Sequence, residues 1–208
     1  MGDQEQTWIN SARCGDEDAF GNLVELYQRP VFNLCYRMLG TPMAAEDAAQ
    51  ETFMRAFVHL SSYDVARSFS SWLLSIASHH CIDQLRRKHH QLLSLDSLSD
   101  DMWSGEEQAE PEEIVLDREK ERAVNLLLQR LPADYRAAVV LRYWYDMSYD
   151  EIARLLDTTV SAIKSRLFRA RHMLARGNDP TSDEPAARRT LSAPAAGGSG
   201  RSGVWAIA

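Results

Sequence analysis

Apolar residues recur at spacings of three and four along most of the chain, which is the period of an amphipathic helix. Phe20, Leu23, Leu26 and Tyr27 form one such face in a segment that starts near Glu17. We find neither the strict alternation of apolar and polar residues that marks a half-buried strand nor an Asn-Gly hairpin signal. The pattern therefore predicts an all-α protein.

Glycine and proline positions divide the first half of the chain into helices. Gly40 ends one segment, Thr41 has an N-cap side chain, and Pro42 suits the first position of the next helix. Pro30 is expected to interrupt or restart the helix in which it lies. The helices expected in this half cover about residues 8–12, 17–39, 42–60 and 71–88, with a loop over 61–70.

The composition changes near residue 91. Ser, Asp, Glu and Gly dominate residues 91–112, which we interpret as a flexible acidic linker. Two helical domains flank it, over residues 1–90 and 113–177. Residues 178–208 combine prolines with Gly, Ser and Ala, a composition that predicts a disordered tail.

Charge is segregated along the chain. The net charge of −7 over 208 residues argues weakly against binding to nucleic acid. However, residues 91–117 contain nine acidic residues and no Lys or Arg, whereas residues 158–178 contain five Lys or Arg and no acid. Residues 86–90 form a second basic cluster. Because binding to a polyanion depends on local potential, both basic segments are candidate contacts with nucleic acid.

Several classes of protein are excluded. No apolar run approaches the roughly 20 residues that span a bilayer, and no secretion signal opens the chain. Cys14, Cys35 and Cys81 form no CxxC pair, which favours a reduced cytoplasmic protein. His79, His80 and Cys81 would fan about 100° apart on a helix, so they cannot converge on one metal. With no nucleotide-binding or hydrolase motif either, we expect no enzymatic activity, no cofactor and no metal.

A segment late in the second domain predicts a helix-turn-helix. Ser148 and Glu151 have the spacing of a capping box. Asp157 and Thr158 form a tight turn, and Thr159 can cap the helix that follows. The apolar residues of that helix recur at spacings of four, three and four: Ile163, Leu167, Ala170 and Leu174.

The other side of this second helix is basic. It presents Lys164, Ser165, Phe168, Arg169 and His172 together. A short helix, a turn and a basic second helix form the unit that reads the major groove of DNA. The alternative is a helix pair with a solvated basic face. The lack of any acid between residues 158 and 178 weighs against it, because a solvated face usually carries both signs.

Two further surfaces stand out in the first domain. Asp47, Gln50, Glu51 and Met54 share one helix face, for which simple solvent exposure is the alternative. Aromatic residues also precede a basic helix, an arrangement that suits stacking on unpaired bases with neutralisation of phosphates. Core packing is the alternative for these aromatics. The residues concerned are Tyr63, Phe69 and Trp72, followed by His79, Asp83, Arg86 and Arg87.

Two long stretches carry a resemblance to a known family. The sequences AEDAAQETFMRAF (45–57) and FSSWLLSIASHHCIDQLRRK (69–88) resemble domain σ2 of the extracytoplasmic-function (ECF) sigma factors of bacterial RNA polymerase. The sequence LPADYRAAVVLRYWYDMSYDEIARLLDTTVSAIKSRLFRARHML (131–174) resembles domain σ4. The two matches occur in the family's order with an acidic linker between them.

The resemblance implies a protein that binds core RNA polymerase, recognises −10 and −35 promoter elements and promotes DNA melting. It also implies an anti-sigma partner and no enzymatic activity. It implies contacts with the polymerase β′ clamp helices by Asp47, Gln50, Glu51 and Met54, and with the β flap by σ4. It implies capture of a flipped −10 base by residues 62–69, and −10 contacts by Tyr63, Phe69, Trp72, His79, Asp83, Arg86 and Arg87. It implies −35 contacts by Thr159, Ser161, Lys164, Ser165, Phe168 and Arg169, with Arg166 and Arg171 on phosphates.

Two positions depart from the family pattern, and two other functions stay open. His79 stands where the family often has Asn, and Asp157 stands where it often has Gly. The first departure leaves the −10 sequence open, whereas Asp tolerates the left-handed backbone that the turn requires. A stand-alone helix-turn-helix regulator predicts a receiver or ligand domain, which the helical first half does not suggest. A helical adaptor would leave the acid-free helix unexplained.

Overall fold

The computed structural model describes residues 2–94 and 112–176, and this part of the chain consists of helices and short loops without a strand. It confirms the predicted all-α class. The helices are α1 (Gly2–Arg13), α2 (Glu17–Leu39), α3 (Pro42–His59), the 3₁₀ turn η1 (Leu60–Ser62), α4 (Phe69–Ser94), α5 (Glu112–Gln129), α6 (Ala133–Trp144), α7 (Tyr149–Leu155) and α8 (Val160–Arg176).

The first helices begin and end where local chemistry requires it. A carboxylate oxygen of Asp16 accepts a hydrogen bond from the amide of Ala19 at 3.0 Å and caps α2. Gly40 ends α2 in the left-handed region, with φ of 86°, where L residues are strained. Thr41 then caps α3, and Pro42 occupies the first turn, as predicted. The segmentation of this half therefore follows from residues adjacent in sequence.

Pro30 differs from its expected effect. It lies inside a continuous α2 instead of interrupting it. A proline removes one backbone donor and crowds the preceding turn, which normally breaks a helix. Here Val31, Leu34 and Cys35, within the next five residues, are buried. Tertiary packing of this face therefore maintains the helix through the proline.

Helices occupy both ends of the segment 91–112 that was predicted as a linker. Helix α4 continues through Ser94, because Gln91, Leu92 and Leu93 are good helix formers, and Glu112 already belongs to α5. Residues 95–111, the rest of that linker, and 178–208, the predicted tail, lie outside the described residues.

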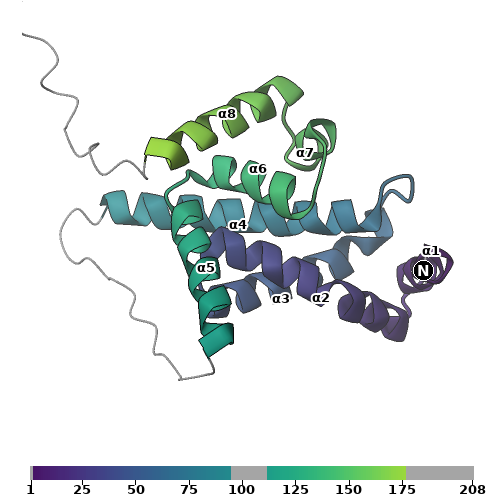
Figure 1. The fold of residues 1–208 in the computed structure, drawn as a ribbon. Helices are drawn as coiled ribbons and strands as arrows, with labels where there is room; N and C mark the ends of the chain where they lie inside the picture. Colours follow the sequence, from purple (N-terminus) through teal and green to yellow (C-terminus); the bar gives the residue numbers. More distant parts are fainter. Residues whose placement is uncertain (1, 95–111, 177–208) are drawn as a thin grey trace, which may run out of the picture.

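The N-terminal domain, residues 2–94, is a helical bundle. Helices α2, α3 and α4 pack against one another, while α1 packs on α2 at one end (Figure 1). Leu23 and Leu34 of α2 and Leu73 of α4 are buried between these helices. The apolar positions of α4 face this core, and the other side of the helix is polar.

The C-terminal domain, residues 112–176, contains the predicted helix-turn-helix. Helix α6 is its buried centre, with Val140 and Leu141 fully excluded from solvent. Helices α7 and α8 pack on α6, and α8 lies on the side of α6 away from the N-terminal domain (Figure 1). Ile163 and Leu167 anchor α8 to this centre, so the opposite face of α8 is presented outward.

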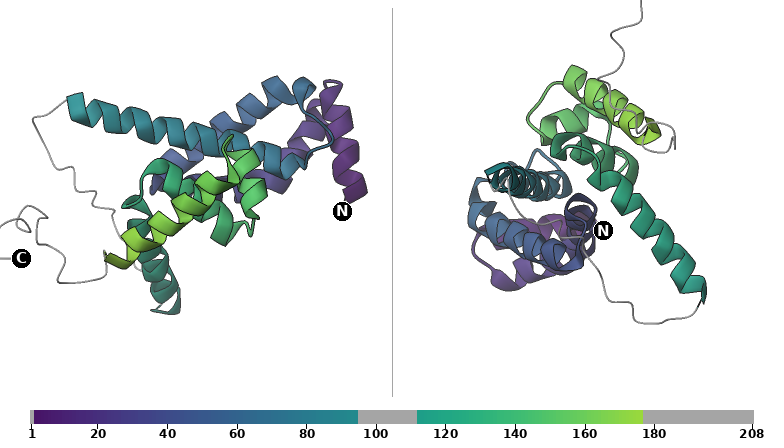
Figure 2. Two further views of the ribbon diagram at one scale, coloured as in Figure 1. Left: turned by 90° about the horizontal axis from the view of Figure 1, so that it is seen from above. Right: turned by 90° about the vertical axis from the view of Figure 1, so that its left-hand side faces the viewer.

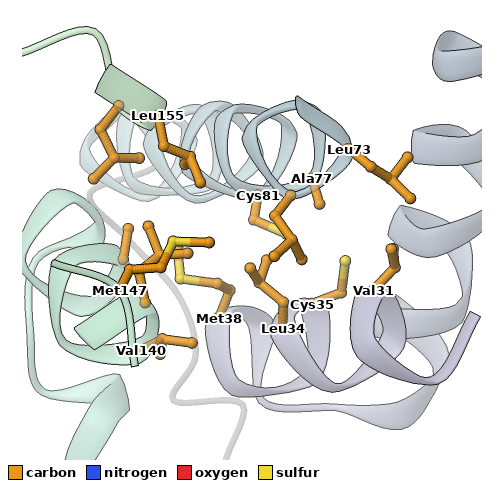
Figure 3. Packing of buried hydrophobic residues seen from close by; sticks show 14 of the residues in the cluster. Val31, Leu34, Cys35, Met38, Leu73, Ala77, Cys81, Val140, Met147 and Leu155 are labelled. Atoms are coloured by element: carbon orange, nitrogen blue, oxygen red, sulfur yellow. The ribbon is translucent and has the colours of Figure 1, made fainter. Parts of the chain in front are cut away.

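The two domains pack directly on each other. Helix α6 contacts α2 and α4, and α7 contacts α4; the two further views show α6, α7 and α8 together on one side of the bundle (Figure 2). Val140, Met147 and Leu155 point toward Met38 and the bundle core (Figure 3). The apolar core is therefore continuous across the domain boundary.

Polar contacts fix this packing. The guanidinium of Arg136 donates to the main-chain carbonyl of Met38. The hydroxyl of Tyr145 donates to the carbonyl of Pro30 at 2.5 Å. Arg37 of α2 lies over the ring of Trp144, with 4.4 Å between the guanidinium carbon and the ring centre.

Candidate nucleic-acid interface

The first helix of the helix-turn-helix begins with the predicted capping box. The amide of Glu151 donates to the Ser148 hydroxyl oxygen at 3.3 Å, and a Glu151 carboxylate oxygen accepts from the Ser148 amide at 2.8 Å. The Ser148 side-chain hydroxyl also donates to this carboxylate at 2.7 Å. These hydrogen bonds lower the pKa of Glu151, so the box is complete at neutral pH.

The turn between α7 and α8 also forms as predicted. Asp157 adopts φ of 46°, a left-handed conformation that Asp tolerates better than most residues. The hydroxyl of Thr159 accepts a hydrogen bond from the amide of Ala162 at 3.1 Å and caps α8. Helix α8 is thereby oriented by its N-terminal cap and by its buried face.

The exposed face of α8 brings together most of the predicted −35 residues. Lys164, Ser165, Phe168, Arg169 and Arg171 line a shallow groove of about 520 Å³ together with a residue of α7, Tyr149. The Phe168 side chain is 58% exposed, an unusual position for an aromatic ring. Thr159 and Ser161 are exposed at the start of the same helix. Basic and apolar groups on one outward face can meet phosphates and base edges together.

Some arginines of α8 already have protein partners. Arg169 lies 3.3 Å from the hydroxyl of Tyr135, and Arg171 donates to the carbonyl of Leu167 in its own helix at 3.3 Å. Both side chains remain exposed. Arg166 is different: its side chain is only 24% exposed and lies 3.8 Å from the carboxylate of Asp134. In this conformation Arg166 faces α6 and not the groove.

Tyr63, before α4, and Phe69, the first residue of α4, are packed in the core, which is the alternative that the sequence left open for the aromatics. Tyr63 and Phe69 are only 4% and 3% exposed, and their rings meet at 89° with centres 5.5 Å apart. The Tyr63 hydroxyl donates to the carbonyl of Arg67, and burial raises its pKa. Neither ring is open to a base in this conformation. Trp72 is half-buried and packs on both.

Trp72 also lines a depression beside the predicted base-capture loop. Ser68 and Arg67 of the loop line the same pocket, whose volume is about 240 Å³. Its other wall comes from α7, through Glu151 and Arg154. The loop that was expected to meet DNA therefore faces the C-terminal domain.

The polar face of α4 contains the remaining predicted −10 residues. His79 has Nδ1 2.8 Å from the carbonyl of Ser75 and Nε2 3.8 Å from the carboxylate of Asp157. Arg86 also contacts the C-terminal domain, where it donates hydrogen bonds to the carboxylate of Asp134. Asp83 and Arg87 are exposed. The face is continuous, but two of its four predicted contacts are engaged by the C-terminal domain.

The predicted polymerase-binding face on α3 is accessible. Asp47 and Gln50 are exposed, and Met54 is 65% exposed. Glu51 accepts a hydrogen bond from Arg55 at 2.6 Å, which lowers the pKa of this carboxyl. Two further apolar residues of this helix, which no sequence pattern singled out, are also exposed: Met43 at 75% and Val58 at 70%.

Two residues with central roles had no distinctive signal in the sequence. Asp134, in the first turn of α6, accepts hydrogen bonds from Arg86 at 2.9 and 3.0 Å. Arg136, two residues further along α6, is 6% exposed and donates hydrogen bonds to three main-chain carbonyls. An acidic residue in the first turn of a helix is common because it interacts favourably with the helix dipole, and an arginine in a helix is usually solvated. Only their contacts with residues far away in sequence, Arg86 and Met38, distinguish Asp134 and Arg136 from ordinary surface residues.

Over residues 2–94 and 112–176, no three His, Cys, Asp or Glu side chains lie close enough together to hold a metal ion. Within the same ranges, none of the helices combines the length and apolarity needed to cross a bilayer.

Comparisons with known proteins match both domains. Residues 23–91 match the family description Sigma-70 region 2, and residues 121–174 match Sigma-70, region 4. The chain is 35% identical to the ECF RNA polymerase sigma factor SigW of Bacillus subtilis, over 80% of this chain and 92% of that protein. It is 30% identical to the RNA polymerase sigma-H factor of Pseudomonas aeruginosa, over 86% of this chain and 95% of that protein.

Solved structures share the fold. One is CnrH in complex with the cytosolic domain of CnrY, with a TM-score of 0.59 and 23% identity, covering 83% of this chain and 95% of that one. Another is the sigma factor RpoE of Bartonella quintana in complex with the anti-sigma factor NepR, with a TM-score of 0.58 and 22% identity, covering 74% and 93%.

Proposed function

Since the chain belongs to the ECF sigma factors of the sigma-70 family, we propose that α3, α4 and α8 divide its work between polymerase binding, −10 recognition and −35 recognition. As a sigma factor, it recruits core RNA polymerase to promoters and initiates transcription there. The exposed basic face of α8 is the observation that best supports assigning individual residues to these steps.

Helix α8 reads the −35 element. Lys164, Ser165, Phe168 and Arg169 share the groove on its exposed side, and Arg171 adds charge at the edge. In this arrangement Lys164 and Arg169 meet base edges in the major groove. Contacts with phosphates fix the register of the helix but carry no sequence information.

Helix α4 and the loop before it act on the −10 element. Arg86 and Arg87 supply positive charge along α4, and His79 and Asp83 lie on the same face. Unstacking a base costs a few kcal/mol, so a loop that binds the flipped base favours melting of the correct sequence. Because Tyr63 and Phe69 are buried, we assign the contact with the flipped base to the exposed part of the loop and to Trp72.

Helix α3 binds the polymerase. Its exposed face combines Asp47 and Gln50 with Met54 and Met43. Exposed methionines beside charged groups suit a protein interface, in which apolar contact supplies affinity and charge supplies orientation. We assign this face to the β′ clamp helices and the C-terminal domain to the β flap.

The partners also include an anti-sigma factor. Support comes from the structure of Bartonella quintana RpoE, which was solved with the anti-sigma factor NepR. We further propose that the chain has no catalytic activity of its own and that it acts in the cytoplasm, at the nucleoid. Transcription is then carried out by the polymerase, and this chain contributes only binding.

Run-off transcription tests the proposal. The chain is added to core polymerase with a template that contains a −35 and a −10 element, and transcripts are measured with each element intact or scrambled. We expect initiation only in the presence of the chain and loss of initiation with either scrambled element. Binding of the free chain to DNA without any effect on purified core polymerase would instead favour a stand-alone helix-turn-helix regulator.

A further inference from the structure

We propose that the pocket between α2 and the end of α6 binds a nucleoside di- or triphosphate, with the phosphates on Arg29 and Arg37 and the base against Trp144. The inference goes beyond the proposed function, since neither promoter DNA nor the polymerase is assigned to this pocket. Its volume is about 270 Å³, and its lining consists of Arg29, Pro30, Asn33, Arg37, Trp144 and Tyr145.

One wall of the pocket is a positively charged stripe of α2. Arg29, Asn33 and Arg37 follow one another at intervals of four residues, which places them on the same face of the helix. The lining contains no Asp or Glu. Within residues 2–94 and 112–176, neither arginine forms an ion pair with a carboxylate. Two guanidinium groups without an internal counter-charge attract an anion.

The spacing of the stripe favours a ligand with more than one negative charge. Eight residues of helix span about 12 Å, so Arg29 and Arg37 approach the pocket from its two ends. A guanidinium binds phosphate oxygens through two parallel N–H donors. The side-chain amide of Asn33 lies between the two arginines in sequence and supplies a further donor. A chain of two or three phosphates offers oxygens to all three side chains.

The other wall offers a surface for a planar ring. Trp144 is 40% exposed, although α6 packs on the helical bundle. The guanidinium carbon of Arg37 lies 4.4 Å from the centre of this ring, so positive charge and aromatic surface are adjacent. Nucleobases stack on exposed aromatic rings whatever their identity. A ligand that carries both phosphates and a base therefore matches both walls.

A contact within the protein holds the two walls together. The Tyr145 hydroxyl donates to the carbonyl of Pro30 at 2.5 Å and ties the end of α6 to α2 beside the pocket. Because the walls are set before a ligand arrives, binding costs less conformational entropy. The volume of the pocket is close to the lower limit of small-molecule pockets, about 300 Å³. This size fits a small ligand better than a protein segment.

Fluorescence anisotropy of a ribose-labelled ADP tests binding to the free, full-length chain. Unlabelled ADP, pyrophosphate and adenosine then compete for the site, which separates the contribution of the phosphates from that of the base. We expect ADP to compete about tenfold or more better than pyrophosphate or adenosine. Equal competition by pyrophosphate would overturn the role of Trp144 and the nucleotide assignment with it. No saturable change in anisotropy would overturn the site itself.

A charge substitution locates the site. Asn33→Asp places a carboxylate between the two arginines and keeps the size of the side chain. Asn10→Asp is the same chemical change at an exposed position of α1 and is the control. We expect Asn33→Asp to weaken ADP binding about tenfold, with little change in the control. Equal affinity in these two variants would show that ADP binds elsewhere and would overturn the assignment.

Substitution of the aromatic ring tests the other wall. Trp144→Leu should weaken ADP binding while leaving pyrophosphate binding nearly unchanged, because only the base meets this ring. Trp144→Phe keeps an aromatic surface and should retain most of the affinity for ADP. A parallel loss of ADP and pyrophosphate binding in Trp144→Leu, not rescued in Trp144→Phe, would contradict stacking.

The thermal midpoint of the free chain gives an independent measurement. A ligand that binds only the folded chain stabilises it, so we expect about 1 mM ADP to raise the midpoint of the wild type and of Asn10→Asp. The rise should be much smaller in Asn33→Asp, whose midpoint without ADP shows whether it folds normally. The same rise in all three chains would contradict the site. Run-off transcription without added ADP diphosphate competitors decides the proposed function separately.

Discussion

The guanidinium of Arg136, in the first turn of α6, donates a hydrogen bond to the main-chain carbonyl of Met38 near the end of α2. It also donates to the carbonyls of Gln129 at 2.8 Å and Leu131 at 3.1 Å. One side chain thus satisfies carbonyls from the end of α2 and from the turn between α5 and α6. Burial lowers the pKa of Arg136 to about 10, so the group is charged at neutral pH.

Removing this side chain should destabilise the folded protein. Arg136→Ala leaves three carbonyls without their donor, and each buried unpaired group costs about 1–3 kcal/mol where water cannot replace the donor. We expect a loss of about 3 kcal/mol in the free energy of unfolding, measured by urea denaturation. Arg154→Ala, at an exposed position of α7, is the control and should change stability by less than about 0.5 kcal/mol. Equal losses in both variants would contradict the role of Arg136.

The groove on α8 separates residues that read bases from residues that hold phosphates. Lys164→Ala or Arg169→Ala should cost about 1–3 kcal/mol and relax the preference at one −35 position. Arg171→Ala should weaken all promoters alike and lower the salt slope by about one unit, because a phosphate contact releases counterions. The measurement is binding of holoenzyme to a panel of −35 mutants at several salt concentrations.

Arg166 belongs with the phosphate contacts in this division, although it faces Asp134 in the free chain. Arg166→Ala should therefore resemble Arg171→Ala in holoenzyme. A uniform loss for Lys164→Ala, without any change in base preference, would show that the division is wrong.

The exposed face of α3 should be required for binding to core polymerase. Asp47→Arg together with Gln50→Ala places a positive charge and removes an amide on that face. We expect affinity for core polymerase to fall by about 2 kcal/mol or more, roughly 30-fold, with normal helical content. The measurement is co-purification and titration with core polymerase, checked by circular dichroism. Glu25→Arg, an exposed charge reversal on α2, is the control, and a similar loss there would point to a general charge effect.

His80 should make stability depend on pH. Burial lowers the pKa of His80, and Arg55 and Arg87 act in the same direction, whereas Glu51 and Asp83 oppose them. The folded chain therefore binds this proton less tightly than the unfolded chain, whose histidine titrates near 6.5. Stability should fall as the pH drops through 6.5 toward the lowered folded value.

The thermal midpoint at pH 7.5, 6.5 and 5.5 checks this expectation. His80→Gln should reduce the decrease between these pH values, because the titrating group is gone. His59→Gln, at an exposed position, should keep the wild-type decrease. An unchanged pH dependence in His80→Gln would assign the effect to other groups.

The sequence by itself determined the features that depend on near neighbours. Ser148 and Glu151 are three residues apart, and their mutual hydrogen bonds form as soon as the first turn of α7 does. The caps at Thr41 and Thr159, and the left-handed turn at Asp157, are equally local. For the same reason the apolar period located α8 and its exposed basic face, since a helix repeats every 3.6 residues.

Only the tertiary structure decided which polar groups meet and which aromatics are buried. Arg86 and Asp134 are 48 residues apart, and no spacing rule relates them until α4 and α6 pack together. Tyr63 and Phe69 lie at the start of a helix that carries basic residues, as base-stacking residues would, but the bundle encloses both rings. The physical reason is that hydrogen bonds within a helix are set by local backbone geometry. Burial and ion pairs between helices depend on where the whole chain places each surface.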